Sequence, residues 1–268
     1  NFFAAPIMVK RLVDSPAVDR CDHSSLKALI YGGAPILAED LRRAVEKLGP
    51  CLVQLYGQGE SPMTISYLPH HGHVLQGTPA QMKHLGSAGI PRTDVEVSIF
   101  DPGDNELPPG QMGEIVTRSD LVMKGYWQRK EATAEVMTDD GYFLTGDIGI
   151  MDEDGYVTIV DRKKNMILVS GFNVYPTEVE EVMSGHPKIV ECGVIGINNG
   201  ESGEVPKIFV VRQDESLTKE EVLKYSQDNL TGYKRPRYVE FIDELPMTAT
   251  GKVMRRVLRQ REIDKREV

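Results

Sequence analysis

Residues Leu144 to Glu181 read LTGDIGIMDEDGYVTIVDRKKNMILVSGFNVYPTEVEE, and this stretch lies between two parts of the chain that have different sequence patterns. It contains an isolated acid after Thr-Gly (Asp147), a charged Asp-Arg-Lys-Lys cluster (161–164) and a Ser-Gly-Phe-Asn loop (170–173). Domain boundaries fall in polar connecting segments, and binding residues often lie on loops. We therefore expect a hinge between two domains that also carries chemistry.

The chain before this stretch alternates between strand and helix patterns. A short apolar run at 26–31 precedes Gly32-Gly33-Ala34-Pro35 and a segment, 37–49, whose apolar residues recur at helical spacing. Residues 51–60 repeat the arrangement of apolar run and glycine. We predict a parallel α/β layout over 1–85, with both glycine loops at the carboxyl ends of strands, where open sheets bind ligands. Residues 1–14 read as helix interior, so we expect a piece of a longer chain.

The pattern changes to β after this region. Asp-Gly turns and a Pro/Gly-rich segment separate alternating runs over 86–163, which predicts hairpins and a small β-barrel or sheet. A compact α+β domain is expected over 164–268, with capping boxes at Thr177-x-x-Glu180 and Thr218-x-x-Glu221 and a final helix from about Lys252. The predicted domains are therefore 1–163, comprising 1–85 and 86–163, and 164–268.

Composition limits the class of protein. The chain has 268 residues, 40% of them hydrophobic, and a net charge of -9, which argues against a general nucleic-acid binder. Basic residues outnumber acidic ones after Lys234, which suits small phosphorylated ligands or simply a solvated terminal helix. No apolar run is long enough for a transmembrane segment, so we expect a cytoplasmic protein. Cys21, Cys51 and Cys192 are too far apart for a zinc motif or a disulfide framework.

The glycine loops and the isolated acid are candidate nucleotide contacts. Gly33 and its neighbours would let backbone approach a ligand closely, although an ordinary βα turn also explains them. Tyr56 can stack on a base, and Glu60 supplies a hard oxygen ligand for Mg²⁺. Asp147 can accept both hydroxyls of a ribose, or it caps a turn. Two such loops on adjacent strand ends favour a nucleotide crevice.

Two further polar segments have weaker patterns. Lys252 follows a glycine in a polar loop before a helix, which suits a mobile cation that stabilises developing charge, although most exposed lysines only aid solubility. His70, His71 and His73 lie in a Pro/Gly loop without helical spacing. Because a zinc site needs defined ligand geometry, we interpret these histidines as part of a polar loop.

Six ordered motifs together resemble the adenylate-forming (AMP-binding) acyl-CoA synthetase superfamily. They are Tyr31-Gly32-Gly33-Ala34-Pro35, Tyr56-Gly57-Gln58-Gly59-Glu60, Gly125-Tyr126-Trp127, Leu144-Thr145-Gly146-Asp147, Asp161-Arg162-Lys163-Lys164 and Thr250-Gly251-Lys252. The segment from Ile159 to Val182 is most similar to bacterial medium- and long-chain fatty acyl-CoA ligases. The resemblance covers essentially the whole chain and implies part of a two-domain enzyme that activates a carboxylic acid with ATP and transfers it to coenzyme A.

The resemblance also implies roles for individual residues. Nucleotide binding would involve Gly33, Ala34, Pro35, Tyr56, Gly57, Asp147 and Arg162. Glu60 would hold Mg²⁺, Lys164 would lie at the domain hinge, and Lys252 would bridge the carboxylate and the α-phosphate during adenylation. The coenzyme A path would be bordered by Ser170, Gly171 and Phe172.

The sequence departs from the family pattern in two respects. Gly59 stands where the family usually has Thr or Ser, and the earlier phosphate loop that ends in a lysine is absent, as is most of the acyl pocket. We therefore expect this piece alone to be inactive or nearly so. Two alternatives stay open: an adenylating enzyme with another acceptor, such as a carrier protein or, in luciferase-like members, oxygen, and a non-catalytic nucleotide-binding homologue.

Overall fold

The structure is a computed structural model that describes residues 1–36, 38–200 and 203–266. The chain folds into two compact units, 1–159 and 160–268. Our expected boundary between 163 and 164 stays a prediction. Among the described residues, no helix has the length and apolar character that a membrane span requires.

The first sheet of unit 1 has the strand order β1-β2-β3-β4-β5. Its strands are β1 (Phe2–Ala4), β2 (Leu29–Gly32), β3 (Leu52–Gln58), β4 (Ser61–Leu68) and β5 (Ile90–Pro91). The first three strands are parallel, as predicted, and β4 and β5 add antiparallel. Glycine-containing loops thus follow the adjacent strands β2 and β3.

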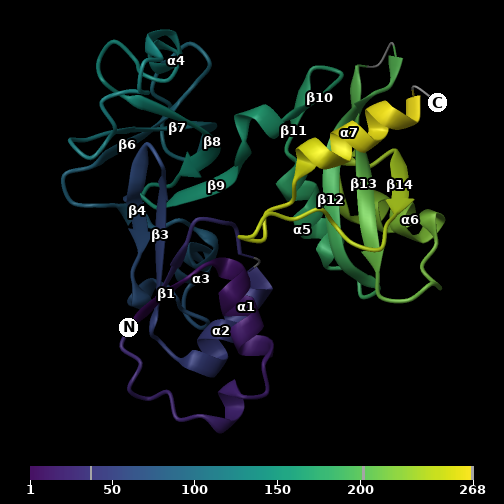
Figure 1. The fold of residues 1–268 in the computed structure, drawn as a ribbon, viewed down its shortest axis with the longest axis horizontal. Helices are drawn as coiled ribbons and strands as arrows, with labels where there is room; N and C mark the ends of the chain where they lie inside the picture. Colours follow the sequence, from purple (N-terminus) through teal and green to yellow (C-terminus); the bar gives the residue numbers. More distant parts are fainter. Residues whose placement is uncertain (37, 201–202, 267–268) are drawn as a thin grey trace. The chain divides into compact units, whose positions relative to one another are not determined.

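Short helices accompany this sheet (Figure 1). They are α1 (Pro6–Asp14), η1 (Val18–Arg20), α2 (Ala38–Leu48), η2 (His70–Gly72), α3 (Pro79–Lys83) and η3 (His84–Gly86). The apolar stripe of α2, Leu41, Ala44 and Leu48, is buried in one core with Leu29 and Leu52 of the sheet. Our prediction that residues 1–14 are helix throughout is wrong for the first residues. Pro6 starts the helix, and the segment before it pairs with β2 instead.

The second sheet of unit 1 is antiparallel and open. It consists of β6 (Glu96–Phe100), β7 (Met112–Arg118), β8 (Phe143–Met151) and β9 (Val157–Arg162), in that order, and α4 (Lys130–Ala134) lies between β7 and β8 in sequence. The predicted hairpins are confirmed, but the β-barrel is wrong for the residues that the structure describes. Four strands are too few to close around a packed interior, so the edges stay apart.

Gly89 is the point where the two sheets of unit 1 join. Its carbonyl accepts the Val157 amide at 2.8 Å, and the Ala88 amide donates to the Val157 carbonyl at 2.7 Å. The φ of Gly89 is +81°, and a Cβ at this position would collide with the backbone carbonyl of Tyr67. Only glycine fits both the conformation and the space.

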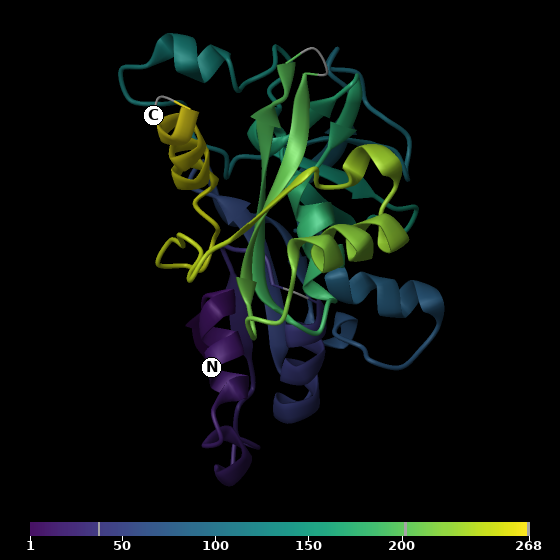
Figure 2. The same cartoon turned by 90° about the vertical axis from the view of Figure 1, so that its right-hand side faces the viewer.

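Unit 2 is built on a three-stranded sheet with helices on both faces (Figures 1 and 2). The sheet contains β12 (Ile189–Asn198), β13 (Glu204–Arg212) and β14 (Tyr238–Phe241), and a separate hairpin contains β10 (Ile167–Val169) and β11 (Phe172–Val174). The helices are η4 (Lys163–Asn165), α5 (Pro176–Ser184), α6 (Lys219–Asn229), η6 (Gly232–Lys234) and α7 (Arg255–Arg266).

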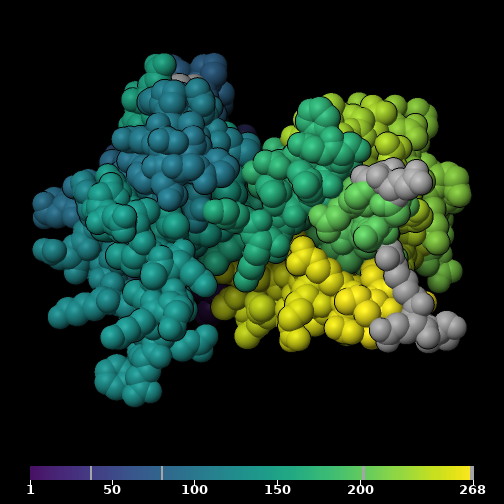
Figure 3. Space-filling view, turned by 90° about the horizontal axis from the view of Figure 1, so that it is seen from above, coloured from purple at the N-terminus to yellow at the C-terminus, as the bar shows by residue number. Residues whose placement is uncertain are grey.

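Strand alternation divides the core of unit 2 in two. Val194 and Ile208 pack in the cluster that includes α5 and α6, whereas Ile195 and Phe209 pack with Leu258 of α7. The opposite side of α7 forms an outer surface of the unit, visible in yellow in Figure 3. The expected α+β unit is therefore present.

The two predicted capping boxes have different outcomes. The Thr218 hydroxyl accepts the Glu221 amide at 3.2 Å and caps α6, as predicted. The box at Thr177 is wrong, because α5 begins one residue earlier, at Pro176, and the Thr177 hydroxyl donates to Asp161 instead. The final helix begins at Arg255 and not near Lys252. The residues from Thr248 to Lys252 form a tight turn instead, in which the Thr248 amide donates to the Lys252 carbonyl.

Candidate functional site

Asp147 is the centre of a buried polar cluster in unit 1. Its side chain belongs to a residue that is only 5% exposed, and its Oδ2 accepts the Tyr56 hydroxyl at 2.7 Å and the Gln58 side-chain amide at 2.6 Å. Burial, with the Asp147 charge as the next cause, raises the pKa of Tyr56 well above its usual value. Tyr56 therefore stays protonated and donates the hydrogen bond. The structure thus brings the predicted residues Tyr56 and Asp147 together.

A bulge in β8 presents Asp147 to that cluster. Three residues, Thr145 to Asp147, oppose the single residue Ile115 on β7. Gly146 at the centre has a φ of +69°, and the Thr145 hydroxyl donates to the Ile115 carbonyl at 2.6 Å. Bulges re-aim side chains next to functional sites. The Thr-Gly-Asp sequence therefore has a local structural reason.

The predicted glycine loops follow β2 and β3. Gly33 is exposed with a φ of +82°, and Ala34 and Pro35 continue the loop. Gly57 lies at an irregularity of the β3–β4 register, where a Cβ would collide with the backbone of the returning strand. The requirement for glycine at position 57 is therefore explained by the hairpin itself.

Glu60 lies in the turn between β3 and β4 and carries a carboxylate suited to Mg²⁺. The Tyr126 hydroxyl donates to its Oε1 at 2.7 Å, so the Gly-Tyr-Trp motif has a partner in the second glycine loop. Over residues 1–36, 38–200 and 203–266, no three His, Cys, Asp or Glu side chains are arranged to hold a metal. A single carboxylate still fits Mg²⁺, which commonly binds one or two carboxylates together with substrate phosphates.

Asp161, near the end of β9, links the charged cluster to α5. Its Oδ1 accepts the Arg162 amide at 2.6 Å and the Asn165 side chain at 2.9 Å, while its Oδ2 accepts the amide and hydroxyl of Thr177 at 2.9 and 2.8 Å. The carboxylate thereby satisfies an otherwise unpaired amide in the first turn of α5. Lys164 lies in η4, directly within this tied segment.

Ser170 and Gly171 form the two-residue turn of the β10–β11 hairpin. Both have positive φ, +49° and +89°, which matches a type I′ turn. A Cβ at Gly171 would meet no atom within 4 Å, so the space beside it is open. Phe172 is 57% exposed and stacks on Tyr233 with ring centroids 4.8 Å apart.

Lys252 is exposed at the end of a self-bonded hairpin. Its carbonyl accepts the Thr248 amide at 2.8 Å, and its amide donates to the Thr248 hydroxyl at 3.0 Å. Gly251 completes the turn with a φ of +82°. The backbone of the predicted adenylation lysine is thus fixed locally.

The histidine loop is structural. His73 is buried; the Tyr31 hydroxyl lies 3.0 Å from its Nε2 and the Pro69 carbonyl 2.9 Å from its Nδ1. Tyr31 must donate, because Nδ1 supplies the proton to the carbonyl. His73 thus has protein partners at both ring nitrogens, which the spacing of the histidines could not indicate.

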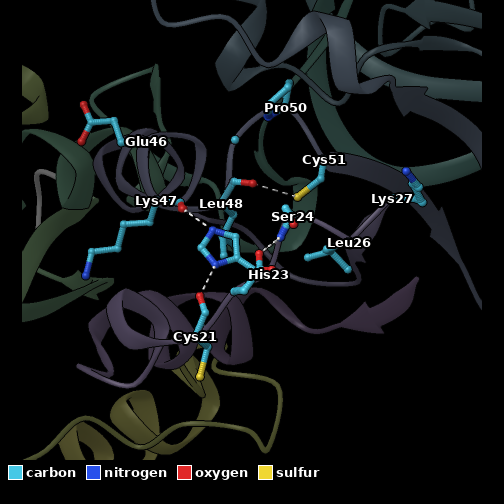
Figure 4. Close-up of a pocket in the computed structure, with 12 residues that line it drawn as sticks. Cys21, His23, Ser24, Leu26, Lys27, Glu46, Lys47, Leu48, Pro50 and Cys51 are labelled. Carbon is cyan, nitrogen blue, oxygen red and sulfur yellow. Dashed lines mark hydrogen bonds between the residues drawn. The ribbon is translucent and has the colours of Figure 1, made fainter.

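A separate hollow in unit 1 lies beside the carboxyl end of α2 (Figure 4). His23 is one of the residues that line it, with Nε2 2.8 Å from the Lys47 carbonyl and Nδ1 3.1 Å from the Cys21 carbonyl. Its twelve lining residues include none of the predicted site residues. Because the neutral ring has one N–H, His23 can donate to the Lys47 carbonyl in the last turn of α2 or to the Cys21 carbonyl.

Two site partners were missed by sequence reasoning. Gln58 and Tyr126 belong to motifs that we noted, but no role was assigned to either side chain. The bonds from Gln58 and Tyr126 reach 89 and 66 residues along the chain. Their place in the quoted motifs is the only sequence signal that could have pointed to them.

Unit 1 contains glycine loops after adjacent strands and a buried acid, and unit 2 contains an exposed lysine at the end of a hairpin. The sequence matches the family described as AMP-binding enzyme over residues 1–127 and the AMP-binding enzyme C-terminal domain over residues 178–252. The chain belongs to this family of AMP-binding enzymes.

Individual relatives support the same conclusion. The chain is 44% identical over 248 residues to a long-chain-fatty-acid–CoA ligase of Escherichia coli O6:H1, covering 92% of this chain and 42% of the relative. Two solved structures are similar: amide bond synthetase McbA from Marinactinospora thermotolerans (35% identity, TM-score 0.84) and ATP-bound MatB from Rhodopseudomonas palustris (34%, 0.85). The matched regions cover 96% and 97% of this chain, and 52% and 50% of the McbA and MatB chains, respectively. The chain therefore spans about half the length, or less, of these proteins.

Proposed function

We propose that the protein carrying this chain is an ATP-dependent acyl-CoA ligase. The observation that carries the proposal is the buried Asp147 carboxylate in the β8 bulge, which accepts hydrogen bonds from Tyr56 and Gln58 of β3. A buried carboxylate on a prearranged bulge suits a ribose, whose two hydroxyls are donors. The similarity to MatB from Rhodopseudomonas palustris, which was solved with ATP bound, supports a nucleotide ligand.

In the first half-reaction, an oxygen of the substrate carboxylate attacks the α-phosphorus of ATP and pyrophosphate leaves, which gives an acyl-adenylate. The Lys252 ammonium would contact the carboxylate and the α-phosphate oxygens, where charge develops. Gly33, Ala34 and Pro35 would line the adenine beside Tyr56 and Gly57, with Arg162 on the ribose. Glu60 would hold Mg²⁺, which supplies charge neutralisation on the phosphates when it is bound.

In the second half-reaction, the sulfur of coenzyme A attacks the acyl carbonyl, AMP leaves, and the thiol proton passes to solvent. The turn at Ser170 and Gly171, followed by Phe172, would border the path of the thiol. The open space beside Gly171 supports this role. Lys164 would lie at the hinge that exchanges the two arrangements.

The proposed substrate is a fatty acid. The name of the Escherichia coli relative, a long-chain-fatty-acid–CoA ligase at 44% identity, supports this choice. Because this chain spans 42% of that relative, assays require the full-length protein that contains it.

Replacement of Lys252 by Ala tests the proposal in that protein. Carboxylate-dependent exchange of pyrophosphate into ATP should fall by about 10² to 10³. Lys224→Ala is the matched control, because Lys224 is an exposed lysine of the same unit that pairs with Asp228. Exchange that survives Lys252→Ala would rule out the adenylation role.

A second candidate is an adenylating enzyme whose acceptor is not coenzyme A. The similarity to an amide bond synthetase, at 35% identity, favours this alternative with an amine acceptor. The full-length protein should be supplied with ATP and a fatty acid, with and without coenzyme A or an amine. Thioester product supports the ligase, whereas amide product, or adenylate that accumulates despite coenzyme A, supports the alternative.

A further inference from the structure

A buried ion pair joins α5, β12 and α7 within unit 2. Arg255 Nη2 donates to Glu180 Oε2 at 2.6 Å, and the side chains are 13% and 15% exposed. Glu180 Oε1 also accepts the Val194 amide at 2.7 Å, while Arg255 Nε donates to the Val194 carbonyl at 3.2 Å. The pair therefore forms hydrogen bonds with both the amide and the carbonyl of Val194 in β12.

The position of Val194 explains why these two backbone groups need side-chain partners. β12 is an edge strand of the sheet over the described residues, and Val194 pairs with Ile208 on its inner side. Outward-facing backbone groups on an edge strand need partners, because an unpaired buried amide or carbonyl is costly. Glu180 and Arg255 supply a matching acceptor and donor, which fixes the register of α7 against the strand.

The residues at the start of α7 indicate that Arg255 does not stabilise the N-terminus of this helix. Arg255 is the first residue of α7, Arg256 follows it, and the first turn contains no acid. A helix N-terminus favours negative charge, so arginine at this place opposes the local preference. Glu180, from another helix, compensates for the conflict.

Arg255 stands three residues after Lys252 on the same short segment. The Met254 amide donates to the Pro246 carbonyl at 2.7 Å and Met247 bridges Val253, which closes the hairpin before α7. With its own hydrogen bonds in place, this hairpin has little freedom except at its base. Arg255 fixes one side of that base.

We propose that Glu180 and Arg255 are positioning residues that set the location of Lys252 for adenylation. The proposal rests on the proposed function of Lys252 and adds that α5, which follows the Ser170–Phe172 turn, is the support from which the lysine is held. Glu180 and Arg255 need touch no substrate. A misplacement of about 1 Å can cost roughly 10² in rate, so a small shift of the hairpin base suffices.

The test uses Arg255→Lys in the full-length protein, because lysine keeps the charge but cannot reach both Glu180 and the Val194 carbonyl in the same fork geometry. Pyrophosphate exchange should fall about 10- to 100-fold. Thioester formation from supplied acyl-adenylate and coenzyme A should change by less than about twofold, since that step does not use Lys252. Arg256→Lys, at the exposed neighbouring position, is the matched control and should change neither.

Glu180→Gln provides a second, independent variant, because glutamine still accepts the Val194 amide but removes the charge opposite Arg255. It should show the same selective loss. An equal loss of both half-reactions, or an unchanged exchange rate, would overturn the positioning role.

A double variant separates this proposal from the function on which it rests. In the Lys252→Ala background, Arg255→Lys should cause no further loss of exchange, because the residue through which it acts is gone. A further loss of the same size would refute the proposal. If Lys252→Ala leaves exchange intact, the proposed function fails; if only Arg255→Lys is silent, the positioning role alone fails.

Discussion

Replacement of His73 by Gln should remove a defined part of the acid sensitivity of unit 1. His73 is 3% exposed, with the Tyr31 hydroxyl and the Pro69 carbonyl beside its two ring nitrogens. Burial is the main cause that lowers the pKa of His73 from 6.5 to about 4, and the nearby His70 adds to it. The folded unit therefore requires a neutral His73.

The sign and size of the effect follow from this pKa difference. Above pH 6.5 the histidine is neutral in both states and contributes no pH dependence. As the pH falls from 6.5 towards 4, His73 binds a proton in the unfolded chain but stays neutral in the folded chain. The free energy of unfolding therefore decreases progressively. The full loss is about 3 kcal/mol, at about 1.4 kcal/mol for each pH unit of pKa difference.

Urea denaturation of the wild type and the variant between pH 7 and 4.5 measures this loss. The wild type should be more stable at pH 7, and its advantage should shrink by about 2 to 3 kcal/mol by pH 4.5. His71→Gln is the control, because His71 is an exposed neighbour and should keep the wild-type slope. Parallel pH profiles for the wild type and His73→Gln would refute the reasoning.

Three further predictions concern both units. Gly171→Trp should spare pyrophosphate exchange and stop thioester formation, whereas Gly155→Trp, with a similar φ (+81° against +89°) and equally open surroundings, should leave both reactions intact; an identical effect of the two would exclude the coenzyme path. Tyr56→Phe should lower the free energy of unfolding by about 1.5 to 3 kcal/mol, because it removes a hydrogen bond to the Asp147 carboxylate, and an unchanged urea midpoint would contradict this. Lys207→Met should cost about 3 to 5 kcal/mol by the same assay, because a lysine with a 9% exposed side chain pairs with carboxylates at 2.6 and 2.7 Å; a loss below 1 kcal/mol would show that water replaces it.

Local signals in the sequence predicted much of the fold. Thr218 caps its helix because the capping hydroxyl and the amide it accepts are three residues apart, and the strand and glycine arrangement before residue 60 produces the parallel strands. The Thr177 box failed because a competing acceptor, Asp161, lies 16 residues earlier and takes the hydroxyl. The barrel failed because hairpin signals specify neighbouring strands but not whether the first and last strands meet.

The candidate site divides in the same way. Residue types at motif positions indicated Tyr56, Asp147 and Lys252, and their chemistry can be read from the side chain alone. The long-range contacts of these and neighbouring residues could not be read from the sequence. Arg255 reaches Glu180 across 75 residues, and Tyr56 reaches Asp147 across 91, so these pairings exist only once the sheets have formed.

Gly89 places a limit on how the coding sequence of unit 1 can drift. The collision of any Cβ with the Tyr67 carbonyl involves backbone on both sides, so no rotamer change can relieve it. A saturation library at this codon, selected for folded protein, should return glycine alone, and only silent changes at the third base should survive. Most surface positions tolerate the amino-acid changes that single-base substitutions produce, but Gly89, where the two sheets join, tolerates none of them.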